Sequence, residues 1–132
     1  MALVASPELD EAERDFITPS QMKSVCHIQN DPNAPYLKMF NRYLENREIT
    51  LASDLELWSI ESIKQSVMSN LGVSLLPKFT VQKELDKDML IELATEMPGT
   101  ELTAIYAFNR NKWRSPAMEL FLQILREYYG VE

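Results

Sequence analysis

LELWSIESIKQSVMSNLGVSLLP, residues 55–77, decides the fold, because it predicts a strand, a helix and a second strand in close succession. Ser59 is a suitable N-cap, since its hydroxyl can accept a hydrogen bond from a free amide of the first turn. Apolar residues then recur three and four positions apart, as on one face of a helix: Ile60, Ile63, Val67 and Leu71. Gly72 stands where a left-handed C-terminal cap is wanted, and the apolar run Val73–Leu76 ends at Pro77, as a buried strand does. Two strands joined this closely through a helix run parallel, and parallel sheets bind ligands beyond the carboxyl ends of their strands.

The composition is that of one globular domain. The chain has 132 residues, 45% hydrophobic and 25% charged, which is enough to bury a core. Its net charge of −7 argues against direct binding of nucleic acid, because nothing would offset the repulsion of the phosphates. The single cysteine, Cys26, excludes an internal disulfide and suits a reducing compartment. Because no apolar run reaches the length of a membrane span and no signal-peptide pattern follows Met1, we expect a cytoplasmic protein with no membrane partner.

Further strands and helices are predicted on both sides of the central unit. The expected strands are Ala2–Ser6, Val25–Gln29, Met89–Ala94 and Leu102–Phe108. Helices are expected from Pro35 to about Arg47 and from Ser115 to the end of the chain, with one or two helical turns at Phe79–Leu85. Thr18–Gln21 combines a capping box with proline at the first helical position, which predicts a short helix through about Lys23.

The last predicted helix is unusually apolar. Its polar residues fall on one narrow stripe, formed by Glu119, Gln123, Arg126 and Glu127. A surface helix does not need so wide an apolar face, and burying one large apolar side chain contributes roughly 1.5–3 kcal/mol. We therefore expect a partner surface, either another part of the protein or a second copy.

The sequence offers no set of residues for catalysis, a metal or a cofactor. No serine, histidine and acid are arranged as a catalytic set, so we interpret the chain as a non-enzyme. His27 lacks a second ligand at metal-site spacing and is interpreted as a strand histidine with a structural hydrogen bond. The acidic residues between Glu8 and Asp15 are interpreted as a solvated loop. Trp58 is expected in the core, and Trp113 on the surface or at an interface.

In order and wording, four segments resemble the effector-binding domain of the LysR-type transcriptional regulators. LVASPEL (residues 3–9) resembles the first strand that crosses between the two lobes of that domain. SIESIKQSVMSNLGVSLLP (59–77) is similar to the most recognisable stretch of the family, a helix followed by a glycine and an apolar strand ending in proline. KELDKDMLIEL (83–93) resembles the segment that follows, and LTAIYAFNRNKWRSPAMELFLQILRE (102–127) the returning strand and the terminal helix.

This resemblance implies an α/β fold with a mostly parallel central sheet flanked by helices, one lobe of a type 2 periplasmic-binding-protein-like fold. Residues 1–110 resemble the second lobe with both crossing strands, and residues 111–132 the closing helix of the first lobe. The winged helix-turn-helix and the first half of lobe one have no counterpart here. The resemblance therefore assigns DNA binding to the parent protein and not to this chain.

The candidate ligand-binding residues follow from the sheet edge and from the resemblance together. Asn30, Asp31 and Asn33 come after a predicted strand and match the family's effector-binding loop, while Ser59 and Ile60 open a helix whose free amides suit a carboxylate. Val4 and Ser6 are expected to line the hinge side. The alternative is that the loop is only a turn and Ser59 only a cap. Asp31 would repel an anionic effector, unless it points away or the effector is neutral or carries an amine.

The function implied is the effector-sensing and dimerising part of a LysR-type regulator, which binds a small molecule between its lobes and so modulates DNA binding by the parent protein. Homo-oligomers are expected through the apolar face of the C-terminal helix or through the lobe edge. Two alternatives remain, a solute-binding protein of the same bilobal fold and a small α/β enzyme. The sequence does not identify the effector.

Overall fold

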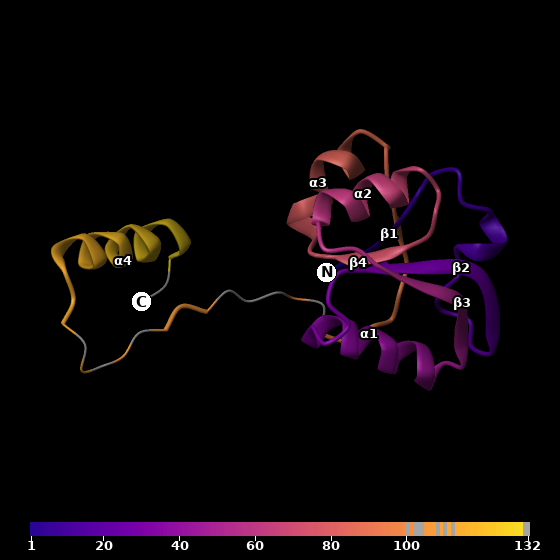
Figure 1. Cartoon of the computed structure of the whole chain (residues 1–132), viewed down its shortest axis with the longest axis horizontal. Helices are drawn as coiled ribbons and strands as arrows, with labels where there is room; N and C mark the ends of the chain where they lie inside the picture. Colours follow the sequence, from indigo (N-terminus) through magenta and orange to yellow (C-terminus); the bar gives the residue numbers. More distant parts are fainter. Residues whose placement is uncertain (100, 102–104, 108, 110, 112, 131–132) are drawn as a thin grey trace. The chain divides into compact units, whose positions relative to one another are not determined.

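The structure is a computed structural model that describes residues 1–99, 101, 105–107, 109, 111 and 113–130. The chain divides into two compact units, residues 1–102 and 103–132 (Figure 1). The first unit contains β1 (Ala2–Ala5), the short 3-10 helix η1 (Glu11–Glu13), β2 (Gln21–Gln29), α1 (Pro35–Asn46), β3 (Ile49–Glu56), α2 (Ile60–Met68), β4 (Ser74–Leu76), α3 (Lys78–Asp86) and β5 (Ile91–Leu93). The second unit contains α4 (Pro116–Tyr129).

The strands of the first unit form two sheets, which a single bridge joins into one layer. β2 and β3 pair in parallel, and β1 lies between β4 and β5, antiparallel to both. A parallel bridge between His27 and Val73 joins β2 to β4, which gives the lateral order β3-β2-β4-β1-β5. β2, β3, β4 and β5 therefore point the same way, and their carboxyl ends meet at one edge, which we call the carboxyl edge. The mostly parallel sheet predicted from the sequence is confirmed in part: four strands share one direction, but β1 is antiparallel to both of its neighbours, and β2 separates the two strands that α2 connects.

Helices cover both faces of this sheet, α1 on one side and α2 with α3 on the other (Figure 1). The α1 core contains Leu3, Phe16, Leu37, Phe40 and Leu75, each at most 2% exposed. The α2–α3 core contains Val4, Ile28, Ile63, Val67 and Val81, each fully buried. The predicted three- and four-residue spacing in α1 and α2 is thus the spacing of the side chains that fill these cores.

The predicted helix through Lys23 is wrong, because β2 already begins at Gln21. Ser20 has a left-handed φ of 60° and turns the chain into this strand. Lys23, Val25 and His27 alternate along β2 and are buried on the α1 side. Burial of this face against the rest of the domain outweighs the local capping signal, which the sequence alone could not weigh.

The glycine predicted to cap α2 has a different role. Asn70, not Gly72, takes the left-handed conformation after α2, with φ of 58°. Leu71 lies beyond the helix and is 60% exposed, so it does not continue the apolar stripe. A Cβ on Gly72 would lie 2.2 Å from the carbonyl oxygen of Cys26, so glycine is needed here for the close approach of two strands.

Two further predictions concern single segments. Trp58 was expected in the core but is 88% exposed, because it follows the last residue of β3 at the sheet edge. Trp113 is exposed, as predicted. Of the predicted strand Leu102–Phe108, residues 102–104 and 108 lie outside the described residues, and the described residues 105–107 form no strand.

The second unit contains the helix predicted from Ser115 onward. The Ser115 hydroxyl accepts a hydrogen bond from the Met118 amide at 3.2 Å, and Pro116 occupies the first turn. Gly130 ends the helix with φ of 63°. The apolar side chains of α4 that the structure leaves exposed are Met118, Leu120, Phe121, Ile124, Tyr128 and Tyr129.

Candidate functional site

The carboxyl edge of the sheet brings together segments that are far apart in the sequence. Asn30 follows β2, Leu57 follows β3, Pro77 follows β4 and Ala94 follows β5. The N-terminus, marked in Figure 1, lies at the same edge because β1 runs in the opposite direction. Ligands of open α/β sheets bind outside this edge, so the carboxyl edge is the candidate binding site.

The loop from Asn30 to Ala34 is held in one conformation by its own polar groups. Asp31 Oδ1 accepts from the Asn33 amide at 2.9 Å, and the Asp31 carbonyl accepts from the Ala34 amide at 2.9 Å. The Tyr36 hydroxyl, from the first turn of α1, donates to Asn30 Oδ1 at 3.0 Å. One oxygen of the Asp31 carboxylate is therefore engaged by the turn. Tyr36 is thus a residue of α1 that supports this loop, and the sequence did not single it out as part of the site.

Ser59 and Ile60 lie at the same edge, at the start of α2. The Ser59 hydroxyl accepts from the Ser62 amide at 3.4 Å, which confirms its prediction as the N-cap. Ser59 is exposed, and Ile60 is half-buried against the α2–α3 core. The loop after β2 and the start of α2 follow paired neighbouring strands, because Gln29 lies opposite Glu56 in the β2–β3 register.

Val4 and Ser6 do not lie with the other candidate residues. Val4 is fully buried in the α2–α3 core, where Ser74 is its partner across the β1–β4 pairing. Ser6 follows β1 at the opposite edge of the sheet, because Ala5 pairs with Ile91 at the start of β5. Its hydroxyl accepts from the Glu8 amide at 3.1 Å. The structure thus brings five of the predicted residues to the carboxyl edge: Asn30, Asp31, Asn33, Ser59 and Ile60.

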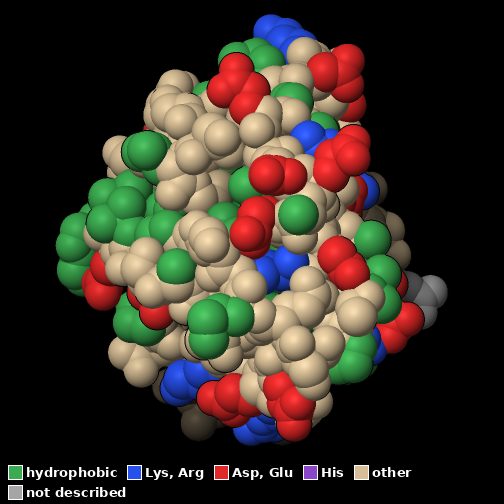
Figure 2. All heavy atoms as spheres, turned by 90° about the vertical axis from the view of Figure 1, so that its right-hand side faces the viewer, with side chains coloured by type: hydrophobic (Ala, Val, Ile, Leu, Met, Phe, Trp, Pro, Cys, Tyr) green, Lys and Arg blue, Asp and Glu red, His purple; other side chains and the backbone are tan. Residues whose placement is uncertain are grey.

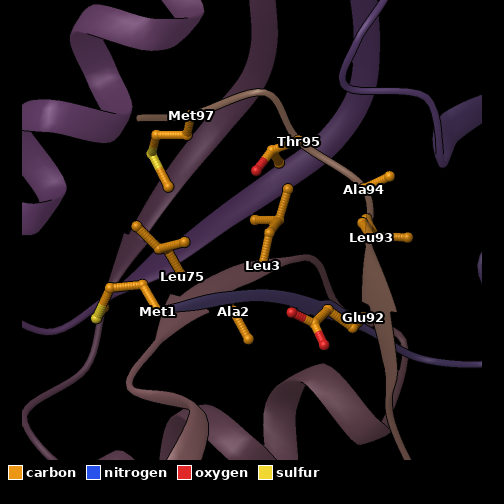
Figure 3. A pocket seen from close by; sticks show the side chains of 9 residues that line it. All are labelled: Met1, Ala2, Leu3, Leu75, Glu92, Leu93, Ala94, Thr95 and Met97. Atoms are coloured by element: carbon orange, nitrogen blue, oxygen red, sulfur yellow. The ribbon is translucent and has the colours of Figure 1, made fainter. Parts of the chain in front are cut away.

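A second feature of the carboxyl edge is a hollow of about 400 Å³ beside β1 and β5 (Figure 3). Its walls are Met1, Ala2, Leu3, Leu75, Glu92, Leu93, Ala94, Thr95 and Met97. Leu3, Leu75, Thr95 and Met97 point toward one another across it, while Ala2 and Glu92 point away (Figure 3). None of the seven residues predicted from the sequence lines this hollow, because mainly core residues of the sheet form it.

The face of the molecule shown in Figure 2 gives no sign of a nucleic-acid surface. On the face shown in Figure 2, acidic side chains are spread widely, and the lysines and arginines occur as separate small groups. At the carboxyl edge, Lys78 is paired with Glu92 at 2.7 Å. This pattern agrees with the net charge of −7 and with the absence of a continuous basic patch on the face that Figure 2 shows.

Neither a metal site nor a membrane-spanning helix is present in the part of the chain that the structure describes. No group of three or more histidine, cysteine, aspartate and glutamate side chains there is placed to hold a metal ion. In the same residues, no helix has both the length and the apolar character needed to cross a membrane.

Residues 1–130 match the family model described as the LysR substrate binding domain. The chain belongs to this family. The HTH-type transcriptional regulator YfiE of Escherichia coli K12 is 40% identical over 129 residues, which are 98% of this chain and 43% of that protein. The RuBisCO operon transcriptional regulator of Acidithiobacillus ferrooxidans is 27% identical over 113 residues, or 86% of this chain and 36% of that protein. This LysR substrate-binding domain thus spans less than half the length of these relatives, both of which are named as transcriptional regulators.

Solved structures of LysR-type regulatory domains share the fold. The regulatory domain of CcmR from Synechocystis PCC6803, solved in complex with 2-PG, has a TM-score of 0.69 at 19% identity, over 96% of this chain and 61% of that one. The regulatory domain of HypT from Salmonella typhimurium, solved with bromide, has a TM-score of 0.68 at 17% identity, over 99% of this chain and 61% of that one. The predicted α/β fold of a LysR effector-binding domain is therefore confirmed.

Proposed function

We propose that this LysR substrate-binding domain senses a small molecule held between two lobes and thereby modulates DNA binding by a longer regulator in the bacterial cytoplasm. One observation carries the proposal: the loop Asn30–Ala34 and the start of α2 follow two neighbouring strands, β2 and β3, and so meet at the carboxyl edge. In other open α/β sheets, ligands bind outside this edge. A solved domain of the same fold that holds 2-PG supports a sensing role.

The proposed wall of the site consists of Asn30, Asp31 and Asn33 from the loop and Ser59 and Ile60 from α2. The side chain of Asn33 forms no hydrogen bond within the described residues and is exposed, so it can donate to a ligand. The first amides of α2 offer further donors, and Ile60 offers an apolar contact. A small polar molecule fits this mixture, and the turn that engages Asp31 leaves room for a carboxylate or a neutral group.

The proposed opposite wall belongs to a first lobe. We assign residues 1–110 to the second lobe with both crossing strands, and residues 111–132 to the closing helix of the first lobe. Effector binding would favour a closed arrangement of the lobes, and this population shift would alter how the regulator sits on DNA. DNA contacts would be made by a winged helix-turn-helix domain elsewhere in the longer protein. Dimers would form through the apolar face of α4 or through the edge of the sheet.

The ligand site can be mapped by amide chemical shifts of the isotope-labelled chain, titrated with a panel of organic acids, phosphate esters, amino acids and amines. Because this method detects millimolar binding, it suits a site of which one wall is present. The expected result is a saturable shift of the amides of Asn30, Asp31, Asn33, Ala34, Ser59 and Ile60 with one compound. Shifts that are confined to the hollow around Leu3 and Leu75, or to the Ser6 end of the sheet, would contradict this proposal.

A further inference from the structure

His27 is the only histidine of the chain, and β2 carries it into the interior under helix α1. The residue is 1% exposed, and its ring lies edge-on to the ring of Phe40, with 5.1 Å between the centroids. Nδ1 lies 3.3 Å from Oδ1 of Asp54 on β3, and this carboxylate is 68% exposed. Nε2 is buried and has no hydrogen-bond partner among the residues that the structure describes. The ring is thus held at one end by a carboxylate and covered by α1.

A neutral imidazole suits these surroundings better than a charged one. With its proton on Nδ1, the ring donates to Asp54 and buries only a lone pair at Nε2. A second proton would add a buried N–H without an acceptor and place a charge against Phe40, which costs free energy. Among the described residues, Asp54 on β3 is the charged group that faces the ring, while α1 presents Phe40 and the residue before β4 is Val73.

The balance of these effects has a definite sign. Burial lowers the pKa of His27 below its ordinary value of 6.5, and this effect exceeds the opposite influence of Asp54. Asp54 is a weak counter-charge because most of its side chain is in water. In the unfolded or opened chain His27 would titrate near 6.5, so acid favours any state in which the ring reaches water.

We propose that His27 is a proton-sensitive latch for helix α1: the neutral ring seats the helix on β2 and β3, and protonation releases the helix. Phe40 of α1 covers the His27 ring. Water can therefore reach a protonated His27 most directly when α1 moves away from the sheet. α2 and α3 lie on the other face of the sheet and do not cover the ring (Figure 1). The expected response to acid is therefore a local opening of α1 before the domain unfolds.

This latch is connected to the loop of the candidate site. β2 continues from His27 through Gln29 to Asn30, and Tyr36 of α1 holds the Asn30 side chain. Opening of α1 would remove that hydrogen bond and free the loop Asn30–Ala34. Acid would then weaken effector binding, and this consequence alone rests on the proposed function. The latch itself does not require a ligand.

The test uses the whole chain, without ligand, and follows its single imidazole by NMR between pH 8 and pH 4. Amide protection factors, which are corrected for intrinsic exchange, are measured at the same time. The expected midpoint lies below 6.5, and the protection of Leu37, Phe40 and Leu44 in α1 falls by up to about tenfold per pH unit below 6.5. Ile63 and Val67 in α2 keep their protection. A midpoint at or above 6.5, or an equal loss in α1 and α2, would overturn the latch.

Two variants separate the latch from general acid sensitivity. In His27→Gln, the α1 protection factors should become independent of pH in this range. Asp54→Asn keeps the histidine and removes the carboxylate that favours its charge, so the imidazole midpoint should fall further. An α1 that still opens in acid in His27→Gln, or a midpoint that rises in Asp54→Asn, contradicts the proposal. Because Asp54 is exposed, Asp54→Asn keeps the test decisive if His27→Gln does not fold.

Discussion

At the scale of single residues, Gly72 is needed because another strand passes close to it, which the local sequence does not reveal. The amide of Val73 donates to the Cys26 carbonyl at 2.9 Å, and the Ile28 amide donates back to the Val73 carbonyl at 2.8 Å. These bonds join β4 to β2 and so join the two parts of the sheet. Gly72 lies directly before them, at the closest approach of the two backbones.

Gly72→Ala is expected to destabilise the domain by about 3 kcal/mol, because its Cβ would displace the Cys26 carbonyl. Gly99→Ala is the matched control: it meets no atom within 4 Å, and its φ of 66° should cost only about 1 kcal/mol. Urea unfolding monitored by circular dichroism measures both. Equal stabilities of the two variants would contradict the close-approach explanation.

Tyr43 is a buried residue whose hydroxyl has two partners. It donates to the Phe16 carbonyl at 2.7 Å and accepts from the Glu96 amide at 3.1 Å. Tyr43→Phe leaves both groups without this partner and should cost about 2 kcal/mol of unfolding free energy. Tyr36→Phe, which removes one partly buried bond to Asn30, should cost less than about 1 kcal/mol. Chemical denaturation measures the free energy of unfolding of both variants. A larger loss of stability for Tyr36→Phe than for Tyr43→Phe would contradict this ranking.

Residue-level predictions succeeded where the cause was local. Ser59 and Ser115 are caps, and a cap depends on the residues within one turn. Trp58 and Gly72 were misjudged because their surroundings come from other strands. The pattern of residues 55–77 alone cannot reveal that Cys26 lies close to Gly72, or that Trp58 lies at the edge of the sheet.

At the scale of elements, an ion pair fixes α2 to α3. Lys64 Nζ lies 2.7 Å from Glu84 Oε1 and 3.2 Å from Glu61 Oε2, and the side chains of Lys64 and Glu84 are only 11% and 16% exposed. The hydrogen bond from Lys64 is the main reason that the pKa of Glu84 lies below its ordinary value of 4.5. A carboxyl with a depressed folded pKa contributes stability that is complete above 4.5 and is lost as the pH falls through the folded value.

Lys64→Met should therefore cost about 2 kcal/mol near neutral pH, and this difference from the unmodified chain should shrink below pH 4.5. Lys78→Met removes the more exposed pair with Glu92, whose side chains are 53% and 40% exposed, and should cost no more than about 0.5 kcal/mol. Thermal unfolding at several pH values measures both. A Lys64→Met deficit that stays constant from pH 7 to pH 3 would contradict the role of the ion pair.

Most elements were predictable because their apolar patterns are strong. α1 and α4 follow helical spacing, and β4 is a short apolar run before a proline. β2 was predicted too short, because the capping box at Thr18–Gln21 indicated a helix through Lys23; in the structure the Lys23 ammonium is buried 5.0 Å from the centre of the Phe16 ring. A pattern method has no means of recognising a buried lysine before the aromatic partner is known.

At the scale of the whole molecule, the exposed apolar face of α4 predicts that the protein self-associates. Phe121 is 60% exposed and Leu120 58%. We expect the chain to self-associate through this face, and Phe121→Glu to raise the dissociation constant at least about tenfold, because the charge would be buried in the interface. Gln123→Glu, on the polar stripe, should leave the dissociation constant unchanged. Sedimentation equilibrium measures the dissociation constant of both variants. An unmodified chain that is monomeric at all concentrations would contradict self-association through α4.

The order of elements along the chain identified the family, and the family implied the sheet. What the sequence did not supply was the direction of β1 and therefore the positions of Val4 and Ser6. Both residues lie in a stretch that resembles a crossing strand, but an antiparallel strand carries its end to the far edge of the sheet. Three-dimensional proximity of Asn30 and Ser59, by contrast, follows from parallel strands alone.

The most direct test of the carboxyl-edge site compares the affinity of the mapped ligand for two variants from opposite edges. Asn33→Ala removes an exposed side chain of the loop, and Ser6→Ala changes a buried hydroxyl at the far edge. Calorimetric or NMR titration of each folded variant gives the dissociation constant. The account predicts about fivefold or greater weakening for Asn33→Ala, the loss of one hydrogen bond, and no change for Ser6→Ala. Weakening by Ser6→Ala with an unaffected Asn33→Ala would contradict it.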